Sequence, residues 1–369
     1  MSLAPRWILL PVLAAVAVLT GTMGALAGPG RPAGNRPSVY TIPGDAVFPE
    51  GIALDQRSKD FFVSSTTDGT MFKGNVDHAA LAPFAAGGAD GRTTAIGLKV
   101  DGRGRLFVAG GGTGRAFVLD TKDGRTLKIL DSNPGRSPTF INDVTLAPGF
   151  AYFTDSMRPV ILRAATSGDT VGDFEPWLDL TGTPFVYRSG YNANGIASFD
   201  GGRLLVVVQY NTGKLFRIDT RTKAVSEIDL GGETVTNGDG LVAHGSRLYV
   251  VRNASVKQIS EVKLLHGKRE GRVGATITSD EFMFPTTAAR DGERLLVVNS
   301  QFDKRDGGGT PVLPFTVAAV PLPRGVRGTC RGMRGGGSLS ACRPSRCAPA
   351  TAIAPRSSTS SARTTSTGA

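Results

Sequence analysis

A motif repeated six times constrains the fold of this chain more than any other feature. Each copy has an opening residue, usually followed by Gly or Asp, then a few strand-forming residues, a tight turn and a second strand such as RLFVA. Two short strands joined by a tight turn form a β-hairpin. The opening residues recur every 45 to 52 residues and are Glu50, Ile96, Asn142, Asn194, Asp239 and Thr286. A repeat period in this range is typical of β-propeller blades.

Two more strands follow the hairpin of a repeat. In the second repeat, RAFVLDT and TLKILD flank a turn at residues 122–124, and in the fourth, KLFRIDT and AVSEIDL flank residues 221–223. Four strands in each of six repeats predict an all-β fold, a six-bladed β-propeller over residues 38–323. We expect the strand near Val39–Ile42 to complete the sixth blade beside Phe315–Val320, because ring closure hides the edges that open sheets expose.

The two ends of the chain do not share this repeat. Residues 1–27 combine Arg6, a long uncharged apolar run and small residues before Ala27, which is typical of a secretory signal peptide and predicts a secreted protein. Left uncleaved, the same run is long enough to anchor the chain in a membrane. Residues 28–37 are interpreted as a linker, and residues 324–369 as a disordered, basic, low-complexity tail.

Most of the net charge lies in that tail. It holds eight arginines and no acid, which is eight of the eleven net positive charges of the chain. The remaining body is nearly neutral, and this argues against nucleic acid as a partner, because nucleic-acid-binding folds carry a basic face. Three histidines and three cysteines in the whole chain disfavour a multi-histidine centre, a zinc-finger array or a copper or iron redox site. The oligomeric state is left open.

The opening residues predict a functional site. In a propeller the first strand of each blade lines the central channel, so equivalent positions face one another around the axis. Two of the six opening residues are carboxylates, two are amides and one is a threonine. Converging carboxylate and amide oxygens suit a divalent cation, and calcium accepts such irregular cages best, with zinc, manganese and magnesium as alternatives. The structural alternative is that these residue types only make turns at the strand starts.

Four repeats open with a polar residue followed by Gly or Asp, beginning at Glu50, Asn142, Asn194 and Asp239. This register resembles the regucalcin/gluconolactonase family of six-bladed propellers, and the resemblance covers residues 38–323. It implies a metal-dependent hydrolase whose substrates are small lactones or related esters. It also implies that Glu50, Asn194 and Asp239 hold the divalent cation.

The resemblance assigns catalytic roles as well. It implies that Asp239 is the general base, and that Asn142 contacts the substrate and completes the metal shell through a water molecule. Three residues in the loop before the fourth repeat are further candidates for contacting the substrate at the channel mouth: Tyr187, Arg188 and Tyr191.

Two observations keep other functions open. Relatives that hydrolyse sugar lactones place an arginine two residues before the Asn of the third blade, where this chain has Phe140, and this weighs against a sugar lactone as substrate. The first motif, FPEGIALD from Phe48, also resembles the opening of NHL-type repeats, whose propellers often serve only as binding platforms. The main alternative is therefore a non-catalytic secreted propeller that binds a ligand or partner. A propeller enzyme of another class, such as a lyase or a strictosidine-synthase-like protein, is the third.

Overall fold

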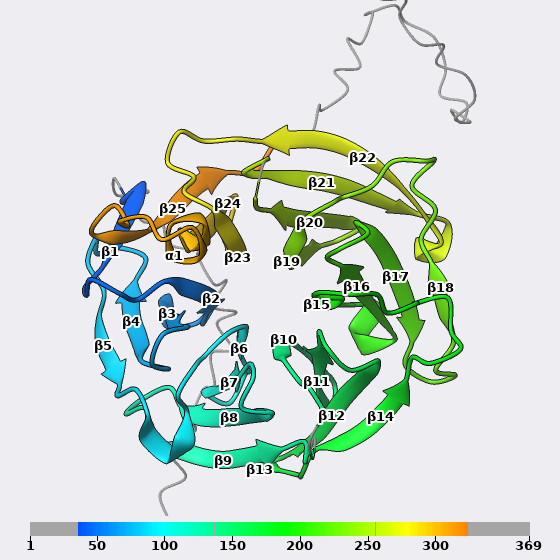
Figure 1. Cartoon of the computed structure of the whole chain (residues 1–369), viewed down its shortest axis with the longest axis horizontal. Helices are drawn as coiled ribbons and strands as arrows, with labels where there is room; N and C mark the ends of the chain where they lie inside the picture. Colours follow the sequence, from blue (N-terminus) through cyan, green and yellow to red (C-terminus); the bar gives the residue numbers. More distant parts are fainter. Residues whose placement is uncertain (1–35, 134, 136, 255, 324–369) are drawn as a thin grey trace, which may run out of the picture. The chain divides into compact units, whose positions relative to one another are not determined.

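Six antiparallel sheets form a ring around a central channel in the computed structural model (Figure 1). The structure describes residues 36–133, 135, 137–254 and 256–323. The predicted signal peptide, most of the predicted linker and the predicted tail lie outside the described residues. The six-bladed β-propeller predicted from the repeat is confirmed.

The strands follow the chain from the channel outwards in the first five blades. The first blade contains β2 (Pro49–Leu54), β3 (Asp60–Ser65), β4 (Met71–Asn75) and β5 (Ala82–Ala85). The second contains β6 (Leu98–Val100), β7 (Arg105–Ala109), β8 (Arg115–Asp120) and β9 (Thr126–Asp131). The third contains β10 (Ile141–Ala147), β11 (Phe150–Asp155), β12 (Val160–Ser167), the short β13 (Thr170–Val171) and β14 (Glu175–Asp179).

The remaining blades complete the ring. The fourth contains β15 (Ala193–Phe199), β16 (Leu204–Gln209), β17 (Lys214–Asp219) and β18 (Val225–Glu227). The fifth contains β19 (Gly238–His244), β20 (Arg247–Arg252), β21 (Gln258–Leu265) and β22 (Glu270–Ile277). The sixth contains β23 (Pro285–Asp291), β24 (Arg294–Asn299), β25 (Phe315–Pro321) and β1 (Val39–Ile42). The innermost strands β2, β6, β10, β15, β19 and β23 contact one another around the channel.

Helical structure is confined to short segments in the described residues. The α-helix α1 spans Phe302–Asp306, and three 3₁₀ turns span Ala89–Gly91 (η1), Asp200–Gly202 (η2) and His266–Lys268 (η3). No helix within the described part of the chain is both long and apolar enough to cross a membrane.

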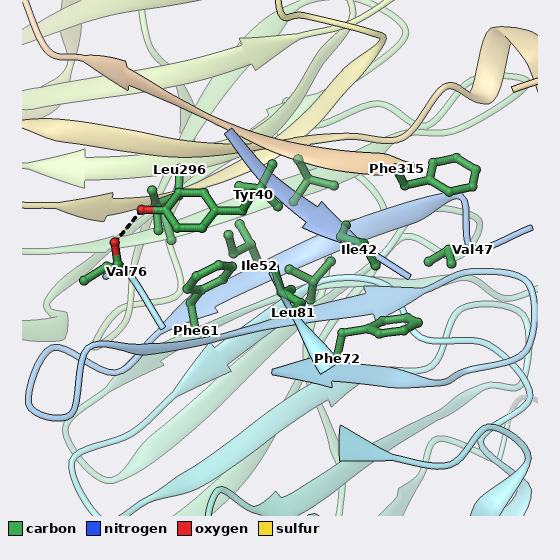
Figure 2. Close-up of a cluster of buried hydrophobic side chains, with 14 of the residues drawn as sticks. Tyr40, Ile42, Val47, Ile52, Phe61, Phe72, Val76, Leu81, Leu296 and Phe315 are labelled. Carbon is green, nitrogen blue, oxygen red and sulfur yellow. Dashed lines mark hydrogen bonds between the residues drawn. The ribbon is translucent and has the colours of Figure 1, made fainter. Parts of the chain in front are cut away.

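The N-terminal strand closes the ring as predicted. β1 pairs with β25 in antiparallel register, from Val39 opposite Ala318 to Ile42 opposite Phe315. The buried side chains of this strand also pack against the first blade, where the hydroxyl of Tyr40 donates to the carbonyl oxygen of Val76 at 2.7 Å (Figure 2). One strand therefore joins the last blade to the first, both by backbone pairing and by side-chain packing.

This closure predicts a large loss of stability for a small change in β1. Ile42 is fully buried in the shared cluster, so Ile42→Ala should lower the free energy of unfolding by about 2–5 kcal/mol. Its neighbour Thr41 is not buried, and Thr41→Val keeps the β-branched shape, so this control should change stability by about 0.5 kcal/mol or less. Urea unfolding of both variants measures the difference. Equal stabilities would mean that β1 does not hold the ring closed.

Candidate functional site

A bulge at the start of the inner strands positions the opening residues. In five of the six blades, the pairing of the inner strand with its neighbour shifts across the opening residue and the residue after it. These shifts lie between Pro49 and Ile52, Ile141 and Val144, Ala193 and Ile196, Gly238 and Leu241, and Pro285 and Ala288. A bulge leaves residues without a ladder partner and redirects their side chains. The opening residues are thereby released from the regular in-and-out alternation of a strand.

The residue after the opening residue lets neighbouring blades approach closely. A side-chain carbon on Gly51 would overlap the carbonyl oxygen of Ile96 in the next blade, and one on Gly195 would overlap that of Asp239. Glycine is required at such positions because any larger residue would push the two backbones apart. The short polar-residue-plus-glycine motif therefore has a packing role that fixes the opening residues relative to one another.

Five of the six opening residues line one pocket, at the end of the channel where the inner strands begin. The cavity has a volume of about 270 Å³, and these lining residues are Glu50, Ile96, Asn142, Asn194 and Asp239. The four polar ones are only 5–6% exposed. Thr286 does not line the pocket; its hydroxyl donates to the carbonyl oxygen of Glu50 at 3.0 Å. The predicted carboxylates and amides are thus brought together from four blades.

Asp239 is held in place by a side chain that directly follows the adjacent strand β20. The amide nitrogen of Asn253 donates to Oδ2 of Asp239 at 2.6 Å, and the hydroxyl of Tyr210 donates to Oδ1 of Asn253 at 3.0 Å. This chain of hydrogen bonds fixes the orientation of the amide, because its oxygen must accept from the tyrosine. Both supporting residues also line the pocket.

The orientation of Asn142 follows from a similar network. The hydroxyl of Ser156 donates its one proton to the carbonyl oxygen of Ala193 at 2.6 Å, so it must accept from Asn142, whose Nδ2 lies 2.9 Å away. The amide oxygen of Asn142 is consequently the atom without a protein partner. This side chain presents an acceptor to the pocket, which suits a cation or the proton of a water molecule.

Two of the five buried polar atoms without a hydrogen-bond partner in the described residues lie at this pocket. They are Oε2 of Glu50 and Oδ1 of Asn142, and both are oxygens. A buried acceptor without a partner costs about 1–3 kcal/mol, so two such oxygens at one pocket suit a cation or a ligand group that donates hydrogen bonds. Among the described residues, no three His, Cys, Asp or Glu side chains form a group that could hold a metal ion. The donor set at this pocket combines two carboxylates with two amides.

The carboxylates of the site are strongly destabilised in their charged form. Burial, followed by the negative charges of Asp239 and Asp143, raises the pKa of Glu50 well above its usual range. Burial and the charge of Asp143 also raise the pKa of Asp239 to about 8, against the opposing hydrogen bonds of Asn194 and Asn253. A cation placed among these groups would remove this penalty, because a nearby positive charge favours the ionised carboxylates.

The opposite end of the channel has different chemistry. A cavity of about 340 Å³ there is lined by the ends of the inner strands, with Lys99 and Arg290 as its charged residues and no acid among its described lining residues. The two ends therefore differ in charge, and the carboxylates are confined to the end where the inner strands begin.

Of the three residues predicted to contact the substrate from the loop before β15, one lines the pocket and two do not. Tyr191 lines the pocket and is 45% exposed. Tyr187 and Arg188 are not among the lining residues, and Arg188 is exposed. The hydroxyl of Tyr187 donates to the carbonyl oxygen of Asp155 at 2.6 Å, and the carboxylate of Asp155 accepts from the backbone nitrogen of Phe140 at 2.9 Å. Tyr187 therefore supports the pocket wall from behind.

Sequence reasoning did not single out several residues that line the pocket or support it, namely Ser156, Tyr210, Asn253, Phe284, Phe302 and Arg305. The repeat could have identified two of them. Asn253 and Ser156 are the polar residues that close the second strand of their hairpin motifs, at the same end as the opening residue of the first strand. Phe302 and Arg305 lie on α1, outside the repeat, and had no such signal.

Solved structures share this fold at low sequence identity. The Mala s 1 allergen of Malassezia sympodialis matches with a TM-score of 0.57 and 14% identity over 77% of this chain and 96% of that one. A luciferin-regenerating enzyme matches with a TM-score of 0.53 and 14% identity over 76% and 93%. The gluconolactonase XC5397 of Xanthomonas campestris matches with a TM-score of 0.53 and 16% identity over 77% and 89%. No family model matches the chain. No curated protein matches it significantly.

Proposed function

We propose that this protein is a secreted, metal-dependent hydrolase of small lactones or related esters. The observation that carries the proposal is the pocket with two buried carboxylates and two buried oxygens that have no hydrogen-bond partner. A gluconolactonase is among the structures that share the fold, and this supports lactone hydrolysis as the reaction to propose. The predicted signal peptide supports action outside the cell.

The donor chemistry fits a divalent cation. Glu50, Asn194 and Asp239 would hold it, since carboxylate and amide oxygens are the ligands that calcium prefers. Glu50 offers an oxygen that no protein group satisfies, and both carboxylates are destabilised when charged and alone. Calcium is our first choice, and zinc, manganese and magnesium are the alternatives to test.

The proposed hydrolysis assigns separate roles to the cation, to Asp239 and to Asn142. A bound divalent cation supplies polarisation of the substrate carbonyl and a more acidic water. Asp239 would accept the proton of the attacking water while Asn253 holds its other oxygen. The same proton would then pass to the ring oxygen of the lactone as the acyl–oxygen bond breaks, so that the products are the hydroxy acid and the unchanged protein. Asn142 accepts a hydrogen bond from the same water through Oδ1 and so orients it toward the carbonyl carbon.

The direct test is hydrolysis of a panel of lactones by the full chain. Activity should be lost when a chelator is added and restored by calcium, or by one of the alternative metals. If no lactone or simple ester is hydrolysed with any of these metals, the protein is a binding propeller, and the metal and carboxylates then serve ligand binding or stability.

Asn142→Ala separates water orientation from metal binding. We expect this variant to lower kcat by about 10- to 100-fold while leaving the stabilisation by metal almost unchanged, because the three cation ligands remain. Asn211 provides a matched control, since its amide oxygen is equally without a partner but lies outside the pocket. Asn211→Ala should leave kcat unchanged. Equal kcat values for the wild type and Asn142→Ala would contradict the role given to this residue.

A further inference from the structure

We infer that the pocket takes a ligand with an aromatic or apolar body, so that its lactones are aryl or alkyl lactones and sugar lactones are poor substrates. The part of this inference that concerns lactones as substrates rests on the proposed function. The part that concerns the class of ligand rests on the residues that form the pocket wall. The cation donors occupy the floor of the pocket, and the wall above them is built largely from aromatic rings.

Two aromatic pairs form opposite parts of that wall. Phe140 packs edge-to-face against Tyr191 with ring centroids 5.1 Å apart, and Phe284 lies against Phe302 at 5.9 Å. All four rings line the pocket. Phe140 and Phe284 stand two residues before the opening residues of their blades, so the repeat itself places them directly above the donor ring. Phe284 is held with a left-handed backbone (φ 58°), a conformation that costs energy for a bulky residue.

The charged residues at this mouth are already engaged. The guanidinium of Arg305 stacks on Phe302 at 4.1 Å from the ring centroid, donates to Oδ1 of Asp306 at 2.8 Å and donates to the hydroxyl of Thr66 at 3.1 Å. A hydroxyl-rich ligand would have to displace these contacts to pair its own groups. An apolar ring could pack against the aromatic faces without displacing any of these contacts.

Exposed apolar side chains are also more numerous at this end of the ring than at the other, and one of them, Tyr191, lines the pocket. The described chain has eight large apolar side chains that are exposed, and six of them lie on the loops at the end of the ring where the inner strands begin. These six are Met157, Val186, Tyr191, Val256, Val312 and Leu313. The concentration of apolar groups on this end favours the approach of an apolar ligand from water.

The physical basis is the unequal cost of burial for the two kinds of ligand. The transfer of an apolar body out of water is favourable, and contacts between aromatic rings strengthen binding beyond the effect of the buried area. A polyhydroxylated ring must give up its hydrogen bonds to water, and each hydroxyl left without a partner in the pocket weakens binding. An aromatic wall therefore selects the first kind of ligand.

Binding of unreactive analogues tests the ligand class separately from the reaction. The two probes are 3,4-dihydro-2-quinolinone, the lactam analogue of an aryl lactone, and δ-gluconolactam, the lactam analogue of a sugar lactone. Calorimetric titration of the full chain, with calcium in excess, should give at least about tenfold tighter binding for the quinolinone. Equal or tighter binding of the gluconolactam, or no binding of the quinolinone, would overturn the inference.

Variants then locate the binding. Phe140→Ala and Phe302→Ala should each weaken quinolinone binding about 3- to 10-fold. Phe150→Ala is the matched control, because Phe150 is also half-buried and lies on the same blade as Phe140, but at the opposite end of β11 from the pocket. If both pocket variants bind the quinolinone as the wild type does, the aromatic wall is not its site. Dihydrocoumarin is the aryl lactone that the quinolinone imitates. If the protein binds the quinolinone but does not hydrolyse dihydrocoumarin, the proposed reaction is refuted, while the inferred ligand class is retained.

Discussion

Replacing Asp239 with asparagine should lower kcat/KM for lactone hydrolysis by about 100-fold or more. The change removes the group that accepts the proton of the attacking water, a contribution usually worth about 10²–10⁴-fold, and it also removes one charge from the cation site. The shape of the side chain is kept, and Asn253 remains beside it. Steady-state hydrolysis at saturating calcium measures the effect.

Controls make this result specific. Asp169→Asn removes an acid whose side chain is 96% exposed and far from the pocket lining, and it should leave hydrolysis unchanged. Asp239→Asn should also retain the melting temperature of the chelated wild type or exceed it, because a buried carboxylate with a raised pKa opposes folding at neutral pH. Wild-type hydrolysis by Asp239→Asn would refute the role of this residue as base.

Removal of divalent cations should lower the melting temperature of the wild type by about 5 °C or more. A ligand at one hundred times its dissociation constant stabilises the folded state by about 2.7 kcal/mol, and each kcal/mol corresponds to about 2–4 °C in a domain of this size. The proposed cation would offset the repulsion between the two carboxylates and would join the first, fourth and fifth blades, which carry Glu50, Asn194 and Asp239. Thermal melts with calcium and with a chelator measure the shift.

The double variant Glu50→Gln, Asp239→Asn should melt at the same temperature with calcium as with a chelator. The calcium effect on the wild type should grow as the pH rises toward 8, because protons compete with the cation for Asp239, whose pKa is raised to about 8 in the metal-free protein. A melting temperature of the wild type that is indifferent to chelator would mean that no cation belongs to the folded protein.

The blades and their order could be predicted from the sequence because the relevant interactions are local. Each hairpin is encoded within about 16 residues by alternation and turn chemistry, and the same pattern returns at a nearly constant interval. The predicted closure by Val39–Ile42 followed from one strand that was left over and one edge that was left open. The opening residues could be located for the same reason, since a fixed period identifies equivalent positions around a ring.

Atom-level features of the site were decided only by the tertiary structure. The register of a motif gives a position along the chain, but the bulges at the strand starts set where the side chains point. The oxygen of Asn142 faces the pocket because the hydroxyl of Ser156 donates to the carbonyl oxygen of Ala193 in the next blade. Asp239 accepts from Asn253, which directly follows the neighbouring strand. The bonds from Asn142 to Ser156 and from Asn253 to Asp239 each close one hairpin over 14 positions, so the motif places these residues but does not say which atom donates. The bond from Ser156 to Ala193 spans 37 positions and two blades, so its geometry depends on how the blades pack.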